Sequence, residues 1–270
     1  MKKVFIALCM LAVAGALFAG GKKETNANAD DSLQNILNKK KLVLGLDDSF
    51  PPMGFRNEAN EIVGYDIDLA KEVARRMGVG LVTQPIDWNA KEQELNSGEI
   101  DCIWNGFTIT EERKRNLRFT PPYLKNAQVV VVQGRQAYQK LTDLAGKTVG
   151  VQSGSSAQDA LDGDADFKAS LKGIVEFKEN LTALMDLETG GIDAVVMDLL
   201  VANDNINRSG KDFRVLGESL APEEYGIGFR KNDKALADKV WETLLAMAKD
   251  GTVDEIAVKW LGADISVIGR

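Results

Sequence analysis

The feature that most restricts the fold of this chain is a regular alternation of short apolar runs with amphipathic runs. Residues 41–45, 79–86, 100–104 and 148–151 have the apolar composition of short strands. Between the first two, residues 65–77 place apolar side chains on one helical face. Because a helix between successive strands is the usual connection of parallel strands, the sequence predicts a parallel sheet with helices on both faces.

A second constraint is an internal repetition. Residues 94–103 and 186–195 each contain a helix end, a glycine stop, an Ile-Asp pair and an apolar strand. Together with the alternation, this repetition favours two similar α/β lobes over one long sheet. Two similar lobes place a binding cleft between them.

Capping patterns indicate where three helices begin. Asn89 and Glu92 have the spacing of a capping box. Thr110 is expected to cap a short helix that contains Arg113. Ser155 or Ser156 is expected to open another.

The composition excludes several function classes. The chain of 270 residues has no histidine, which rules out a Ser-His-Asp triad, a Cys-His pair and any His-ligated metal site. A net charge of −7 disfavours nucleic acid and anionic membranes as partners. Two cysteines are too few for a disulfide-stapled scaffold. No metal or cofactor is expected, and the glycine-rich and acidic runs lack the spacing of a phosphate-binding loop or a calcium loop.

The N-terminus has the pattern of an export signal. Residues 1–20 combine a basic start, an apolar run and small residues, and residues 21–31 are expected to be a flexible linker. The segment resembles a lipoprotein signal in which Gly20 replaces the lipid-bearing cysteine. No later stretch approaches the ~20 apolar residues of a transmembrane helix. We expect a periplasmic or extracellular protein whose remaining thiol, Cys102, is buried and inert.

Polar and aromatic side chains gather where the expected strands end. In open α/β sheets, ligands bind beyond the carboxyl ends of the strands. The residues at those ends comprise a cation, two carboxylates, an aromatic ring and several hydroxyl, amide or backbone donors: Asp47, Phe50, Asn105, Gly106, Thr108, Arg113, Ser155, Ser156 and Asp198. An α-amino acid requires such a set, because its carboxylate needs an arginine and its ammonium needs a carboxylate.

Each of these residues also has a purely local interpretation. Arg113 fits a solvated helix residue, and Asp198 fits a helix cap. Ser155 and Ser156 also fit helix caps, and Phe50 fits loop packing. Their shared location at strand ends favours the binding site.

The motifs, taken in order, resemble the polar amino-acid-binding proteins of bacterial ABC importers, a family of extracellular solute-binding proteins. The resemblance covers about residues 42–261. It is carried by the five segments 64–70, 100–113, 119–123, 149–156 and 192–198.

The resemblance implies a role for each site residue. Arg113, helped by Thr108 and Ser156, is expected to hold the ligand carboxylate. Asp198 is expected to take the α-ammonium together with Thr108 and the Gly106 carbonyl.

It also implies how the ligand side chain is held. Phe50 is expected to stack on the ligand, and Trp88 or Trp104 to line the pocket. Asp47 matches a position that faces the ligand side chain in members that bind basic amino acids. Asn105 and Gly106 replace a pair of serines found in some relatives.

The resemblance further implies a type II periplasmic-binding-protein fold, in which two hinge strands join the lobes and let them close over the ligand. The N-terminal lobe is expected to comprise 32–132 and 222–270, and the C-terminal lobe 133–221. The hinge strands are expected around 129–132 and 224–228. The protein is expected to be a monomer that delivers its ligand to an ABC transporter permease.

The leading hypothesis is therefore a non-enzymatic receptor for an L-amino acid, with arginine or lysine favoured over glutamine because of Asp47. An alternative is an enzyme similar to the cyclohexadienyl dehydratases of the same fold, which add a general acid to the cleft. A third is the sensor domain of a signalling receptor, disfavoured because no membrane segment or kinase follows.

Overall fold

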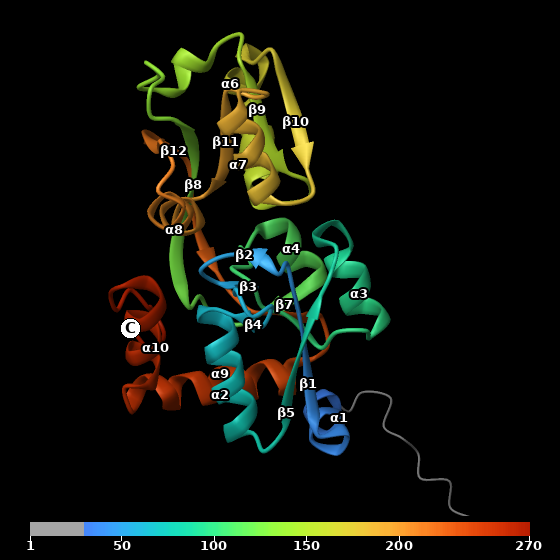
Figure 1. Cartoon of the computed structure of the whole chain (residues 1–270). Coiled ribbons are helices and arrows are strands. Elements are labelled where there is room, and N and C mark those ends of the chain that lie inside the picture. The colour runs from blue at the N-terminus through green and yellow to red at the C-terminus, as the bar shows by residue number, and fades with distance from the viewer. Residues whose placement is uncertain (1–29) are drawn as a thin grey trace, which may run out of the picture.

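The computed structural model describes residues 30–270, so the expected signal peptide and all but the last two residues of the expected linker lie outside the described residues. The described chain forms two α/β lobes, and Figure 1 shows one above the other. Each lobe is built on its own five-stranded sheet. Two long strands, β8 (Leu124–Gln133) and β12 (Phe213–Tyr225), run side by side from the waist into the upper lobe.

The lower lobe is built on the sheet with strand order β5-β1-β6-β13-β7. Its first three strands are parallel, whereas β13 pairs antiparallel with both β6 and β7. The strands are β1 (Lys41–Leu46), β5 (Gly80–Pro85), β6 (Cys102–Ile103), β7 (Leu117–Phe119) and β13 (Gly228–Arg230).

The upper lobe repeats this plan with strand order β10-β9-β11-β8-β12. Strands β10, β9 and β11 are parallel, and β8 and β12 are antiparallel to their neighbours. The new strands are β9 (Thr148–Gln152), β10 (Gly173–Phe177) and β11 (Ala194–Asp198). The expectation of parallel sheets is therefore wrong for one strand of each sheet, because β13 and β8 enter their sheets from the other lobe and run opposite to the four other strands.

The helices cover the faces of the two sheets. The lower lobe contains α1 (Ser32–Lys39), α2 (Tyr65–Arg76), η1 (Trp88–Ala90), α3 (Lys91–Ser97), α4 (Glu111–Asn116), α9 (Lys234–Lys249) and α10 (Thr252–Leu261). The upper lobe contains η2 (Leu141–Leu144), α5 (Ser156–Gly163), α6 (Ala165–Ser170) and α7 (Asn180–Thr189), and α8 (Leu199–Ser209) lies near the waist. A small sheet of β2 (Ser49–Phe50), β3 (Gly54–Arg56) and β4 (Ile62–Val63) follows β1. No helix among residues 30–270 combines the length and the apolar character needed to cross a membrane.

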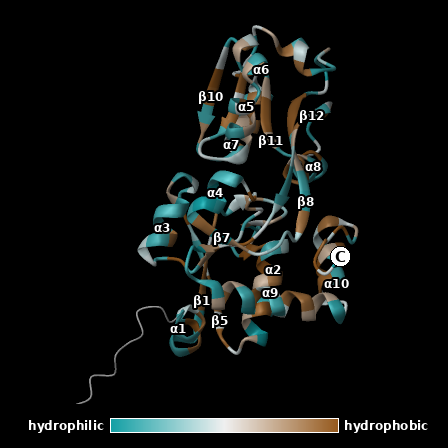
Figure 2. Ribbon diagram, turned by 180° about the vertical axis from the view of Figure 1, so that it is seen from behind, coloured by the Kyte–Doolittle hydropathy of each residue, from teal (hydrophilic) through white to brown (hydrophobic). Residues whose placement is uncertain are grey.

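The cores follow from the two-residue period of the strands. In β1, Leu42, Leu44 and Leu46 belong to the apolar cluster that includes α2, while Val43 packs with Leu95 on the opposite face. Figure 2 shows the same concentration of hydrophobic residues along β11 inside the other lobe. Both faces of the central strands are therefore buried, as expected for parallel strands between layers of helices.

The first copy of the internal repetition fixes how β6 approaches β1. The Asp101 amide donates to the Val43 carbonyl at 2.8 Å, and the Val43 amide donates to Asp101 Oδ2 at 2.7 Å. Gly45 leaves room for the Ile100 side chain, because a Cβ at Gly45 would lie 2.4 Å from Ile100 Cδ1. A glycine, an isoleucine and an aspartate thus set the register of the two strands.

The second copy makes the same contacts in the upper lobe. The Asp193 amide donates to the Thr148 carbonyl at 2.8 Å, and the Thr148 amide donates to Asp193 Oδ2 at 2.9 Å. A Cβ at Gly150 would lie 2.5 Å from Ile192 Cδ1. The repeated Ile-Asp pair therefore has a common structural role in both lobes.

The expected helix starts are confirmed at Thr110 and Ser155, whose side chains accept from the third residue beyond them. The expected capping box at Asn89 is wrong. Asp87 caps η1 by accepting from the Asn89 amide, and the Asn89 side chain donates to Ser153 Oγ of the other lobe at 3.1 Å. Asparagine is a favourable cap residue, but here the Asn89 side chain forms its hydrogen bond with a residue distant in sequence instead of with the helix start.

We expect Gly45→Ala to lower the free energy of unfolding by about 1–3 kcal/mol, because the close-packed core has no space for the added methyl group. Urea unfolding measures this loss, and Gly217→Ala is the control because no atom lies within 4 Å of its Cβ position. Ile100→Val removes Cδ1, so it should rescue part of the loss in the double variant. Strict additivity of the two single changes would contradict this packing account.

Candidate functional site

One small cavity lies where the strands of the two lobes end. Protein atoms leave about 280 Å³ of space there, a volume that includes space open to solvent. The structure brings all the expected site residues to its lining and adds one more: Asp47, Phe50, Trp88, Asn105, Gly106, Thr108, Arg113, Gln152, Ser155, Ser156 and Asp198. Residues as far apart in the chain as Asp47 and Asp198 meet here because the strands of both lobes end at the waist.

Arg113 provides the positive charge of the cavity. Its side chain is 6% exposed, its Nη1 donates to the Thr108 carbonyl at 2.9 Å, and its guanidinium lies 4.7 Å from the centre of the Phe107 ring. The nearest carboxylate, Asp159 Oδ2, is 3.8 Å from Nη2. Burial lowers the pKa of Arg113, and Asp159 opposes that shift. Arg113 is therefore a buried cation with donor capacity to spare.

Hydroxyl groups of both lobes meet beside Arg113. Thr108 Oγ1 and Ser156 Oγ are 2.9 Å apart, so a hydrogen bond joins the two lobes. Ser155 has a different role, because its hydroxyl donates to the Gln152 carbonyl and accepts from the Gln158 amide as the cap of α5. Ser156 is therefore the serine whose hydroxyl takes part in the contact between lobes.

Asp198 provides a buried negative charge. It occupies the cap position of α8, but its side chain makes no capping hydrogen bond. Instead Oδ1 accepts from the Tyr225 hydroxyl at 2.6 Å and from Asn126 Nδ2 at 3.0 Å. Burial first, and then the neighbouring Glu223, raise the pKa of Asp198 well above its ordinary value. The local interpretation of Asp198 as a helix cap is therefore wrong.

A second carboxylate, Asp47, lies at another part of the cavity. Its Oδ1 accepts from the amide and hydroxyl of Ser49, and its backbone amide donates to Asn105 Oδ1 at 3.0 Å. Gln152 Nε2 of the upper lobe donates to Asp47 Oδ2 at 2.7 Å. Gln152 directly follows an expected strand, so its position was the available sequence signal for this additional lining residue.

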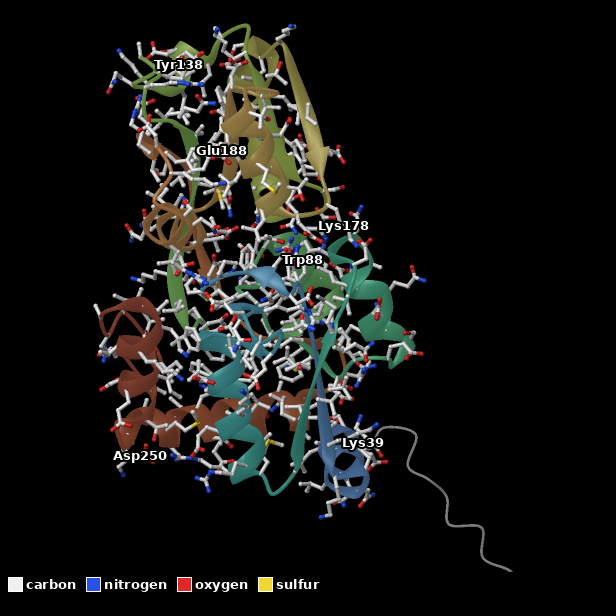
Figure 3. The ribbon with its side chains drawn as sticks, viewed as in Figure 1. Lys39, Trp88, Tyr138, Lys178, Glu188 and Asp250 are labelled. Atoms are coloured by element: carbon white, nitrogen blue, oxygen red, sulfur yellow. The ribbon has the colours of Figure 1, made fainter. Side chains whose placement is uncertain are left out.

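Aromatic rings form the apolar part of the lining. Phe50 and Trp88 are 6% and 9% exposed, and Trp88 packs edge-on against Phe107. Figure 3 labels Trp88 at the waist, with Lys178 on the facing edge of the upper lobe. Trp104, the alternative to Trp88, is wholly buried in the lower core. Of the two tryptophans, Trp88 is therefore the one that lines the cavity.

Gly106 is held by a buried carboxylate that sequence analysis did not identify as functional. Its φ is +55°, a conformation that favours glycine, and a Cβ there would lie 2.9 Å from the Phe50 ring. Asp66 Oδ2 accepts from the Gly106 amide at 2.7 Å and from the Tyr123 hydroxyl at 2.9 Å. Burial raises the pKa of Asp66 to about 7. The aspartate in the first turn of α2 therefore fixes one wall of the cavity.

Contacts beside the cavity also join the lobes. Lys91 Nζ donates to the Gly154 carbonyl at 2.9 Å and to the Trp88 carbonyl at 3.1 Å. Burial lowers the pKa of Lys91 to about 8, and Arg113 adds to that shift. With the bond between Asn89 and Ser153, these contacts hold the lobes together in a closed arrangement. Among residues 30–270, no group of three His, Cys, Asp or Glu side chains is placed to hold a metal ion.

Comparison with known proteins supports the two-lobed fold described above. Residues 42–263 match the model of the bacterial extracellular solute-binding proteins, family 3. The L-cystine-binding protein TcyJ of Escherichia coli (strain K12) is 30% identical over 259 residues, covering 94% of each chain.

Two solved structures have the same fold. Tv2483 bound to L-arginine is 36% identical with a TM-score of 0.85, covering 89% of this chain and 98% of Tv2483. A substrate-binding protein of an ABC uptake transporter from Streptococcus pneumoniae, with bound histidine, is 34% identical with a TM-score of 0.86, covering 88% and 99%. The expected type II periplasmic-binding-protein fold is confirmed.

The buried Asp66 makes stability depend on pH. Because its folded pKa of about 7 exceeds the unfolded value of 3.8, the folded protein retains a proton that the unfolded chain loses between these values. This group therefore lowers the free energy of unfolding as the pH rises from about 4 to 7. We expect Asp66→Asn to remove this pH-dependent part of the free energy of unfolding. Urea unfolding of the wild type and the variant between about pH 4 and pH 7 measures the difference. Parallel pH profiles would contradict the assignment.

Proposed function

Because the chain belongs to the bacterial extracellular solute-binding proteins of family 3, we propose that it binds one L-amino acid outside the cytoplasmic membrane and delivers it to an ABC transporter permease. The amino acid is held in the cavity between the lobes, and closure of the lobes presents it to the permease. A polar or basic side chain is favoured. The protein acts as a receptor and catalyses no reaction.

One observation carries the proposal: a single small cavity is lined by a buried arginine and a buried aspartate that do not pair with each other. Arg113 and Asp198 are 6% and 4% exposed. Burying a charge without a partner is expensive. A zwitterion supplies a carboxylate to one and an ammonium to the other, so an amino acid satisfies both at once.

The carboxylate end of the ligand is assigned to Arg113, Thr108 and Ser156. A guanidinium has five N–H donors in a fork that matches a carboxylate, and the described contacts of Arg113 leave several of them available. Ser156 also begins α5, so its backbone amide is one of the free donors of a helix N-terminus. The ammonium end is assigned to Asp198, with Thr108 and the Gly106 carbonyl.

The ligand side chain is assigned to the part of the cavity formed by Asp47, Asn105 and Gln152, between the rings of Phe50 and Trp88. Asp47 favours a cationic group, so arginine and lysine rank before glutamine. Gln152 donates to Asp47 across the two lobes. A basic ligand would take over that acceptor while its stem packs on the aromatic rings.

Closure of the lobes couples binding to transport. The bonds from Thr108, Asn89, Lys91 and Asp47 to the upper lobe all require the closed arrangement. A ligand that contacts both lobes stabilises the closed state over the open one, and it is this difference that signals occupancy to a permease. The strands β8 and β12 are the proposed hinge. The lobe boundaries at 132/133 and 221/222 stay a prediction.

The proposed specificity is tested by thermal unfolding of ligand-stripped protein against the twenty L-amino acids. A ligand at about a thousand times its Kd stabilises the fold by ~4 kcal/mol, so one or a few amino acids should raise the Tm clearly. Arginine or lysine should give the largest shift. No shift with any amino acid, together with turnover of prephenate or arogenate, would replace the receptor by the dehydratase alternative.

The role of Arg113 is tested by Arg113→Ala. Loss of the buried partner of the ligand carboxylate should cost about 3–5 kcal/mol, a reduction in affinity of roughly a hundredfold to several thousandfold in isothermal titration. Arg115→Ala is the matched control, because Arg115 is exposed on the same helix and should leave affinity unchanged. Arg113→Lys should restore only part of the affinity, because an ammonium lacks the fork. Near-normal affinity in Arg113→Ala would refute the assignment.

A further inference from the structure

A third carboxylate, Glu223 on β12, lies beside Asp198 at the cavity. Asn126 Nδ2 lies 3.0 Å from Asp198 Oδ1 and 2.5 Å from Glu223 Oε1, so both carboxylates are within hydrogen-bonding distance of one amide nitrogen. Gln128 Nε2 also donates to Glu223 Oε1 at 2.9 Å. Two acidic groups from different elements therefore share one donor of β8, the Asn126 amide.

Glu223 also contacts the residues that line the cavity. The Thr108 hydroxyl lies 3.0 Å from Glu223 Oε2, and Gln128 Nε2 lies 3.2 Å from Ser156 Oγ. Gln128 is 1% exposed, and its Oε1 has no hydrogen-bond partner among the described residues. The polar groups around Glu223 therefore lie next to the residues Thr108, Ser156 and Asp198 of the cavity lining, with hydrogen-bonding capacity left unused.

No cation neutralises this pair of carboxylates. Among residues 30–270, no lysine or arginine nitrogen lies within 4.0 Å of Asp198 or Glu223. Arg113 of α4 is the positive group that faces them, and its guanidinium is directed to the Thr108 carbonyl and toward Asp159 of α5.

The remaining neighbours of the pair are uncharged. They are Tyr225 of β12, Asn126 and Gln128 of β8, Ser156 of α5 and Thr108. Two adjacent carboxylates repel each other when both are charged, and no cation here offsets that repulsion.

We propose that Asp198 and Glu223 together form the ammonium subsite, which holds one shared proton when empty and releases it to solvent when an α-ammonium binds. This rests on the proposed function, because it assumes that an amino acid occupies the cavity. The O–H bond of the pair breaks, the proton passes to the buffer, and the ligand ammonium keeps its own protons. The pair changes from one negative charge to two, and the incoming positive charge stabilises the second.

The proposal fixes the sign of the pH dependence. Because binding releases a proton, affinity rises as the pH rises, by up to about tenfold per pH unit while the empty pair is protonated. Once the pH passes the titration of the empty pair, the affinity becomes constant. A single ionised aspartate at this subsite would instead give no proton exchange in the neutral range.

The test is isothermal titration with L-arginine in buffers of different ionisation enthalpy between about pH 5 and pH 8, which yields the number of protons exchanged. If arginine gives no binding, L-histidine, L-cystine and L-glutamine follow as probes. Wild-type protein should release up to one proton per ligand at the acidic end of the range. Glu223→Gln should release fewer protons there, and its affinity should vary less with pH, because only burial then raises the pKa of Asp198. Glu224→Gln, an exposed neighbour on the same strand, should behave as wild type.

A ligand without the ammonium provides a test that needs no variant. 5-Guanidinopentanoate, which is arginine lacking its α-amino group, should bind the wild-type protein more weakly and release no proton. This comparison remains decisive if Glu223→Gln fails to fold. Tight binding of arginine without proton release, or equal release in Glu223→Gln, would overturn the shared proton and leave the receptor function intact. Absence of binding by every amino acid would overturn the receptor function itself.

Discussion

The rest of the structure depends on one constraint: a buried arginine and a buried aspartate lie between two lobes and do not pair with each other. Arg113 and Asp198 are almost fully buried, and their closest partners are backbone, hydroxyl and amide groups. Such an arrangement costs stability unless a ligand completes it. In the proposed function, closure around a zwitterion compensates this cost and links binding to the movement of the lobes.

Two rigid lobes are needed to position those groups, and each is built with the same local device. An Ile-Asp pair lies just before β6 and just before β11. In each pair the aspartate makes one backbone and one side-chain hydrogen bond to the neighbouring strand, which fixes the register of the two strands. Gly45 and Gly150 make room for the isoleucines. Because register is fixed well inside each lobe, the residues after the strand ends emerge at defined positions. The precision of the cavity thus derives from packing several residues away from it.

The two hinge strands also contribute chemistry to the site. Asn126, Gln128, Glu223 and Tyr225 alternate along β8 and β12, which run antiparallel, so their side chains meet around Asp198. Polar residues on these strands hold carboxylates at the waist, where the two lobes meet. In the proposed function, the same set of side chains therefore responds to the charge of the ligand and to the closure of the lobes.

The sequence alone determined what depends on local pattern: the α/β alternation, the repeated Ile-Asp pair, the caps at Thr110 and Ser155, and the residues that follow the strands. The strand-end rule brings these residues to one edge, which is why the expected site residues line a single cavity. Contacts between segments far apart in sequence were decided by the tertiary structure, because side-chain partners depend on how strands and lobes pack. The partner of Asn89, the support of Gly106 by Asp66, the one antiparallel strand of each sheet and the position of Glu223 beside Asp198 all belong to this class.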